Sequence, residues 1–258
     1  MKLTVLVDNH AKGKLQAEWG LSMLLETVEG KTIFDFGSSD LYLKNAAKMG
    51  IDLKDVKKCV LSHGHWDHGT GLAFWDNGGE LICHPEVFVE RYRKNKVLGL
   101  PFSKDEISSK MSVKMSVEPL EIEKNVFYLG EIPRITAFES KYTPFSKADG
   151  TDDFVMDDTG LAMVTQKGLT VLSGCAHSGI CNIVERAREV TGVSNVHAVL
   201  GGFHLKGNGE RTMKTIEYLK NIGPDYISTS HCTDFEALVA FYETFGSIPF
   251  GVGDVIDF

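Results

Sequence analysis

His63-Gly64-His65-Trp66-Asp67-His68 places three histidines and one aspartate within six residues, directly after the mostly apolar run Cys59-Val60-Leu61-Ser62. Imidazole and carboxylate groups are the ligands that Zn²⁺, Mn²⁺ and Fe²⁺ take from proteins. In extended chain, residues i and i+2 point to the same side, so we expect His63 and His65 to bind one ion together. Asp67 and His68 follow in an expected turn, where they can face a second ion or orient a water molecule.

Composition narrows the class of protein. The chain has 258 residues, of which 43% are hydrophobic and 24% charged, as in globular proteins. The net charge of −8 argues against a general affinity for nucleic acid or anionic membrane. No apolar run approaches the roughly 20 residues that span a bilayer, and Met1–Asp8 resembles a short strand rather than a signal peptide. Five cysteines without paired spacing indicate reduced thiols, so we expect a cytoplasmic protein.

Strand and helix patterns alternate along the chain without a linker or repeat, which predicts one α/β domain over residues 1–258. We expect a helix beginning at Pro85 and carrying Tyr92. Thr233–Glu236 is expected to form a capping box for the last helix. The segment 86–151 is poor in motifs, and we expect it to cover part of the site and to hold its specificity. A small anionic substrate and a homo-oligomer are both compatible with the sequence.

Further candidate ligands follow other apolar runs, at strand ends where ligands collect in layered α/β folds. Cys175 and His177 come after Val171–Ser173, and His231 comes after Tyr226–Ser230. His177 is the preferred third ligand, with a structural hydrogen bond as the alternative. Cys175 is either a bridging thiolate or a small buried residue. His204 either contacts substrate or metal, or packs as a hydrogen-bonded side chain.

The H-x-H-x-D-H spacing resembles the metallo-β-lactamase superfamily of metallohydrolases. This resemblance implies a four-layer α/β/β/α sandwich with metals at one edge of the sheets. It implies that His63, His65 and His177 hold the first ion, and that Asp67, His68 and His231 hold the second. It places Cys175 where the superfamily normally carries a bridging Asp. It also implies that Asp35 orients a metal-binding histidine through a hydrogen bond.

A narrower resemblance runs along nearly the whole chain. It joins Trp19–Ser22, the His63 motif, Gly130–Arg134, Asp157-Asp158, Ser173–Gly179, Gly201–Leu205 and His231–Thr233. These pieces are similar to the branch named for 7,8-dihydropterin-6-methyl-4-(β-D-ribofuranosyl)aminobenzene-5′-phosphate synthase. Two departures stand out: Trp19 replaces an expected His, and no His lies between His84 and His177. A one-metal or asymmetric site therefore stays open.

These patterns predict a metal-dependent hydrolase that uses a metal-bound hydroxide on a phosphoester or another anionic small molecule. We expect one or two divalent ions, with zinc favoured and manganese or iron as alternatives. Asp67 is the candidate base if one ion binds, and His204 is the candidate substrate contact, with Arg134 a weaker one. The N-terminus of the helix beginning at Ile180 is expected to favour an anion. A pterin-condensing synthase and a non-hydrolytic metal or iron protein are the alternatives.

Overall fold

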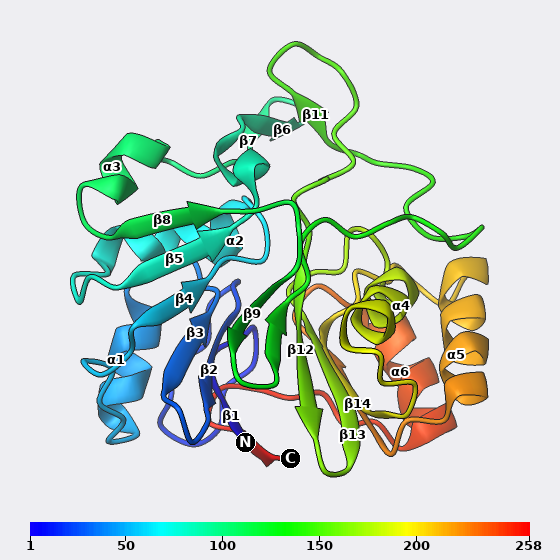
Figure 1. Ribbon diagram of the computed structural model, residues 1–258. Coiled ribbons are helices and arrows are strands. Elements are labelled where there is room, and N and C mark those ends of the chain that lie inside the picture. Colours follow the sequence, from blue (N-terminus) through cyan, green and yellow to red (C-terminus); the bar gives the residue numbers. More distant parts are fainter. The chain divides into compact units, whose positions relative to one another are not determined.

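Two mixed β-sheets underlie the computed structural model, which describes residues 1–258 (Figure 1). The chain divides into two units. Residues 1–117, 143–153 and 251–257 form the first unit, and residues 118–142, 154–250 and 258 form the second. The expected covering segment 86–151 is thereby shared between the units, and its covering role stays a prediction.

The first unit contains a seven-stranded sheet in the order β16-β1-β2-β3-β4-β5-β8. β1, β2 and β3 pair antiparallel, whereas β3, β4, β5 and β8 pair parallel. A smaller sheet has the order β11-β6-β7. The strands are β1 Lys2–Val7, β2 Ser22–Glu26, β3 Lys31–Phe34, β4 Lys58–Val60, β5 Glu80–Cys83, β6 Arg91–Arg93, β7 Lys96–Val97, β8 Ser112–Met115, β11 Ser146–Lys147 and β16 Val255–Asp257.

The helices of the first unit are α1 Leu41–Lys48, α2 Trp66–Gly69, α3 Lys104–Ser108 and the 3₁₀ segments η1 Thr70–Phe74 and η2 Pro85–Phe88. α1 begins where the Ser39 hydroxyl accepts a hydrogen bond from the Leu41 amide at 3.1 Å. It packs beside β1 (Figure 1). Its Tyr42 ring stacks on Trp75 and meets Phe36 edge-on in the buried core. This core supports the strand ends from which the His63 segment emerges.

The second unit contains a six-stranded sheet in the order β15-β14-β13-β12-β10-β9. β13, β14 and β15 are parallel, so their carboxyl ends meet at one edge. α4 and α6 contact this sheet, and α5 contacts both helices (Figure 1). The elements are β9 Leu120–Glu123, β10 Val126–Tyr128, β12 Gly160–Thr165, β13 Gly168–Ser173, α4 Ile180–Thr191, β14 Val196–Gly202, α5 Glu210–Ile222, β15 Tyr226–Ser230 and α6 Phe235–Phe245.

Two expectations about helix starts are wrong. The segment at Pro85 is a short 3₁₀ turn that ends at Phe88, and Tyr92 lies in β6. Backbone pairing of β6 with β7 and β11 is the reason that the helix cannot continue. α6 begins at Phe235 without a side-chain cap from Asp234. The Thr233 hydroxyl instead bonds the Phe203 amide and the Thr229 hydroxyl.

No helix in this fold has both the length and the apolar character needed to cross a membrane.

All five cysteines are buried free thiols, as the sequence predicts. Any of them that faces a metal ligand set is therefore available as a sulfur donor.

Candidate functional site

The His63 segment forms a buried cluster of imidazoles in the first unit. It follows β4, and the short helix α2 turns Asp67 and His68 inward, so that all four side chains are buried. His63 Nε2 lies 3.0 Å from His65 Nδ1, and the His63 and His68 ring centroids are 4.2 Å apart. Two imidazole nitrogens on one tetrahedral zinc are about 3.3 Å apart, from metal–nitrogen distances near 2.0–2.1 Å. The donor set therefore fits a divalent metal.

Asp35 holds one of these imidazoles in a fixed orientation. Its Oδ2 lies 2.7 Å from His68 Nδ1, and the carboxylate also accepts hydrogen bonds from the Ser62 amide and hydroxyl. A proton held on Nδ1 by this carboxylate leaves Nε2 of His68 as the nitrogen that can bind a metal. The hydrogen bond expected of Asp35 is therefore present. Asp35 adopts a left-handed backbone conformation, with φ of 60°.

Trp19 takes part in the same cluster. Its indole Nε1 donates a 2.9 Å hydrogen bond to Asp67 Oδ2. The indole thus supplies a donor that orients the carboxylate from the position where the sequence resemblance leads us to expect a histidine. Sequence reasoning missed this role, because it treated Trp19 only as the loss of an imidazole.

Gly64 explains how the two histidines reach one point. A Cβ atom on Gly64 would lie 1.9 Å from the carbonyl oxygen of Val87, so only glycine allows the segment to pass this close to η2. The backbone between His63 and His65 is therefore fixed by packing as well as by hydrogen bonds.

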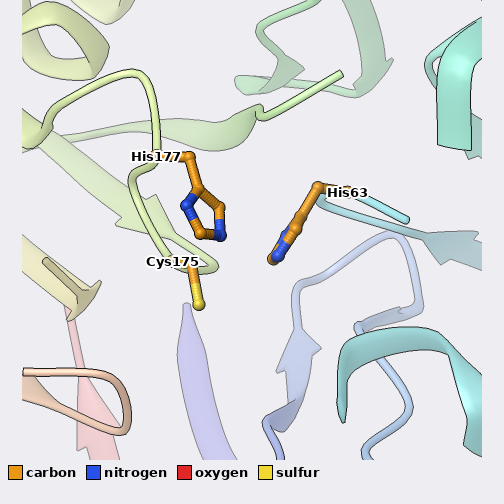
Figure 2. A group of neighbouring side chains, drawn as sticks. All are labelled: His63, Cys175 and His177. Carbon is orange, nitrogen blue, oxygen red and sulfur yellow. The ribbon is translucent and has the colours of Figure 1, made fainter. Parts of the chain in front are cut away.

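The second unit carries the remaining candidate ligands at the ends of its parallel strands. Figure 2 shows Cys175 and His177 on the turn that follows β13, together with His63, which follows β4 in the first unit. His204 follows β14 and His231 follows β15. The Cys175 sulfur lies within 4.8 Å of a ligand atom of His177 and of His231. The parallel order of the strands therefore brings Cys175, His177, His204 and His231 into one neighbourhood.

Left-handed backbone conformations occur in all three turns that carry these ligands, and a buried carboxylate supports the first of these turns. Ala176, His204 and His231 have φ values of 54°, 46° and 54°, a region that non-glycine residues rarely adopt and that clusters at functional sites. Asp158 accepts hydrogen bonds from the Ser178 amide and hydroxyl. Burial raises the pKa of Asp158, and these hydrogen bonds act in the opposite direction. The segment after His177 is thus fixed from the side of Asp158.

Cys232 is a further functional candidate in this neighbourhood. Its sulfur and the ligand atoms of Cys175 and His204 all lie within 4.8 Å of one another. Burial alone would raise the pKa of the Cys232 thiol. Hydrogen bonds with Cys175 and His204, and the charges of His204 and His231, nevertheless hold it well below its ordinary value. No local spacing signals this grouping, because it depends on the order of β13, β14 and β15.

Two other expectations concern anion binding. The Arg134 guanidinium donates to the carbonyl oxygens of Ile132 and Val155, so part of its hydrogen-bonding capacity is used within the chain, and its role as a phosphate contact stays a prediction. The N-terminus of α4 is already occupied by the carboxylate of Glu139, which accepts hydrogen bonds from the Cys181 and Asn182 amides at 3.1 and 3.0 Å. The anion expected at the N-terminus of α4 is therefore a carboxylate of the chain itself.

Two other histidines have hydrogen-bond partners away from the candidate ligands. His84 Nδ1 accepts a hydrogen bond from the Glu86 amide at 3.1 Å and caps η2. His197 Nδ1 pairs with Asp225 Oδ2 at 2.8 Å. Neither side chain is needed as a metal ligand to explain its position, and both serve as control positions.

Comparisons with known proteins agree with this geometry. Residues 20–188 match the model of the metallo-beta-lactamase superfamily. A 7,8-dihydropterin-6-methyl-4-(beta-D-ribofuranosyl)-aminobenzene-5′-phosphate synthase from Methanocaldococcus jannaschii is 31% identical over 95% of this chain and 92% of its own length. An uncharacterized protein from the same organism is 30% identical over 98% of this chain and 99% of its own length.

A solved structure extends the likeness to the fold. The crystal structure of Tm1679, a metal-dependent hydrolase of the beta-lactamase superfamily, has a TM-score of 0.89 and 29% sequence identity. The alignment covers 100% of this chain and 99% of that one. The predicted α/β fold class of the metallo-β-lactamase type is thereby confirmed, and the chain belongs to the metallo-β-lactamase superfamily.

Proposed function

We propose that the protein is a metal-dependent hydrolase that acts on a phosphoester or a related anionic small molecule. The observation that carries this proposal is the buried His63–His68 cluster, in which Asp35 orients His68 and Trp19 orients Asp67. Burying this many imidazole and carboxylate groups is costly unless they are paired or bind metal. The likeness to Tm1679, a metal-dependent hydrolase, supports the same class.

The proposed ligands keep the assignment made from the sequence. His63, His65 and His177 are assigned to one divalent ion, and Asp67, His68 and His231 to another, with Cys175 as a sulfur donor. Zinc suits this mixed set of imidazole, carboxylate and thiolate donors. A bound divalent metal supplies a Lewis acid that lowers the pKa of water to about 7.

The chain's own residues have separate tasks in this proposal. Asp35 keeps the proton of His68 on Nδ1, which leaves Nε2 for metal binding. The Trp19 indole restrains one oxygen of Asp67, and the carboxylate can accept a proton from water if only one ion binds. His204 lies with its ring centroid 4.3 Å from that of His177, and we propose it as the substrate contact.

A phosphoesterase assay tests this proposal directly. Metal-replete wild-type protein is assayed with 4-nitrophenyl phosphate and bis(4-nitrophenyl) phosphate, beside His65→Ala and the control His197→Ala. We expect hydrolysis by the wild type and the control and none above background by His65→Ala. Equal activity in His65→Ala would reject the assignment of the His63 cluster.

A pterin-condensing synthase is the second candidate, because a relative at 31% identity carries that name. In this reaction the amino nitrogen of the ribofuranosylaminobenzene phosphate bonds to the methylene carbon of a dihydropterin diphosphate and loses a proton, the carbon–oxygen bond to the diphosphate breaks, and water is not a reactant. Incubation with both substrates, followed by mass spectrometry, distinguishes the two functions. The coupled product with released diphosphate favours the synthase, whereas hydroxymethyl-dihydropterin alone favours the hydrolase.

A further inference from the structure

A cavity of about 370 Å³ lies in the second unit, and its lining contains none of the proposed metal ligands. One wall is the segment 137–142, and the other is the first turns of α5, which contribute Glu210, Arg211 and Lys214. Its chemistry therefore has to be explained separately from the metal cluster.

The charge of the lining is positive in a chain whose net charge is −8. The lining contains three basic residues, Lys141, Arg211 and Lys214, and one acidic residue, Glu210. Glu210 pairs with Lys214 at 2.6 Å, which leaves the charges of Lys141 and Arg211 uncompensated within the lining. A concave surface of this kind concentrates anions.

Arg211 has hydrogen-bonding capacity that the protein does not use. Its Nε and Nη2 atoms are buried and have no hydrogen-bond partner. These two N–H groups lie on the same edge of the guanidinium, which is the edge that binds two oxygens of a phosphate or carboxylate. Leaving such donors unsatisfied is costly. Arg211 is also a lining residue of the cavity, so a small rotation of its side chain would offer this edge to an anion bound there.

The opposite wall is fixed before any ligand arrives. The Asn182 side chain accepts hydrogen bonds from the Ile135 and Thr136 amides at 3.0 and 2.9 Å. Glu139 anchors the same segment to the N-terminus of α4. The carboxylate of Glu139 is close enough to feel the charge of Arg211, but it accepts its hydrogen bonds from backbone amides and from the Thr136 hydroxyl, and not from Nε or Nη2 of Arg211. A wall held in this way lowers the entropic cost of binding.

We propose that this cavity binds the phosphate group of a small molecule, through Arg211 and Lys141, with Lys214 contributing positive charge. Phe138 and Tyr142 lie in the same lining and offer apolar surface for the organic part of that molecule. The site does not depend on bound metal, so it stands even if the hydrolase proposal fails.

Calorimetric titration of the metal-free, full-length protein with inorganic phosphate tests this proposal. Arg211→Ala and Lys141→Ala are compared with wild type and with Lys220→Ala, which removes the same charge from an exposed position on α5 outside this cavity. We expect each cavity variant to bind phosphate more weakly, with a dissociation constant raised by about tenfold or more, as the loss of a charge-assisted hydrogen bond predicts. Lys220→Ala should leave the dissociation constant close to that of the wild type.

Two results would overturn the proposal. Equal weakening by Lys220→Ala and the cavity variants would mean that phosphate senses only diffuse charge. Phosphate binding that appears only after metal is restored would assign the anion to the metal ligands. Because Lys141 is exposed, its variant keeps the test valid even if Arg211→Ala disturbs the fold.

Discussion

The two sets of candidate ligands are built differently. In the first unit, His63, His65, Asp67 and His68 come from one short segment, and their geometry is set by local turns and by Asp35. In the second unit, the ligands come from the ends of three parallel strands and include two thiols. The first set, which we call the local set, therefore consists of residues close together in the sequence. The second, which we call the strand-end set, comes together only when the sheet forms.

This difference has a physical consequence. A local motif holds its ligands close even when the surrounding sheet is perturbed, but ligands on separate strands depend on long-range packing. Three residues of the second set's turns, Ala176, His204 and His231, also hold left-handed backbone conformations, which persist only when the surrounding structure enforces them. We expect the second set to be the more sensitive to mutations that loosen its unit.

The largest effect is expected from His65→Ala in the local set. Loss of this imidazole, whose Nδ1 lies 3.0 Å from His63 Nε2, should reduce phosphoesterase activity by more than about 100-fold, beyond the loss typical of a supporting residue. The matched control is His84→Ala, which removes another buried histidine of the same unit. If both variants lose activity equally, general instability rather than ligand loss explains the effect.

A supporting residue should give a smaller loss. Asp35→Asn weakens the hydrogen bond to His68 Nδ1, and we expect metal affinity to fall by roughly 10- to 100-fold. Asp225→Asn is the control, because Asp225 forms the same kind of pair with His197 outside both ligand sets. Competition with a chromophoric chelator measures the affinities. Wild-type affinity in Asp35→Asn would show that this hydrogen bond does not support metal binding.

Gly64→Ala tests whether close packing positions the local set. The added methyl group would lie 1.9 Å from the Val87 carbonyl oxygen, so we expect the free energy of unfolding to fall by about 1–3 kcal/mol. Urea denaturation measures it beside Gly209→Ala, where a Cβ meets no atom within 4 Å. Similar stability of the two variants would mean that the His63 segment moves away from η2 at little cost.

The smallest effect is expected for the pH dependence of stability when Glu139 is replaced by Gln. Glu139 anchors the segment 135–142 in the second unit. Burial raises the pKa of Glu139 above 4.5, although the Cys181 and Asn182 amides act in the opposite direction. Because the pKa is higher in the folded state, the folded protein binds more protons than the unfolded chain at pH values between the unfolded-state and folded-state pKa. The stability that this group contributes is therefore fully present below pH 4.5 and declines as the pH rises through the folded-state pKa.

Glu139→Gln removes this decline, so the stability of wild type relative to the variant should fall as the pH rises above 4.5. Metal-free protein is unfolded with urea at several pH values, with the exposed Glu243→Gln as the control. A difference between wild type and Glu139→Gln that stays constant with pH would contradict the raised pKa.

The sequence predicts the local set well because its information is local. Six residues at fixed spacing identify the His63 cluster, and the fold class follows from the resemblance that this spacing carries. The role of Asp35 as the partner of a ligand histidine is also predicted, and the hydrogen bond to His68 is present. The ligand roles themselves stay predictions, as does the description of residues 1–258 as one domain.

The rest depends on contacts between residues far apart in the chain. Cys232 joins Cys175 and His204 only through the order of three strands. The hydrogen bond from Trp19 to Asp67 spans 48 residues. Left-handed conformations at Ala176, His204 and His231 carry no sequence signal, because glycine is the usual indicator of that geometry. The helix predicted from Pro85 is wrong because sheet pairing of β6 overrides the local helix preference. The capping box predicted at Thr233 is wrong because the Thr233 hydroxyl binds the distant Phe203 amide instead.

Elemental analysis of purified, metal-replete protein tests most directly the claim that both ligand sets bind metal. Wild type is compared with His65→Ala from the local set, His231→Ala from the strand-end set, and the control His197→Ala. We predict about two divalent ions per wild-type chain, the number that binuclear hydrolytic sites hold. Both ligand variants should lose metal, and the control should keep it. Full metal content in His231→Ala, or no metal in the wild type, would contradict the claim.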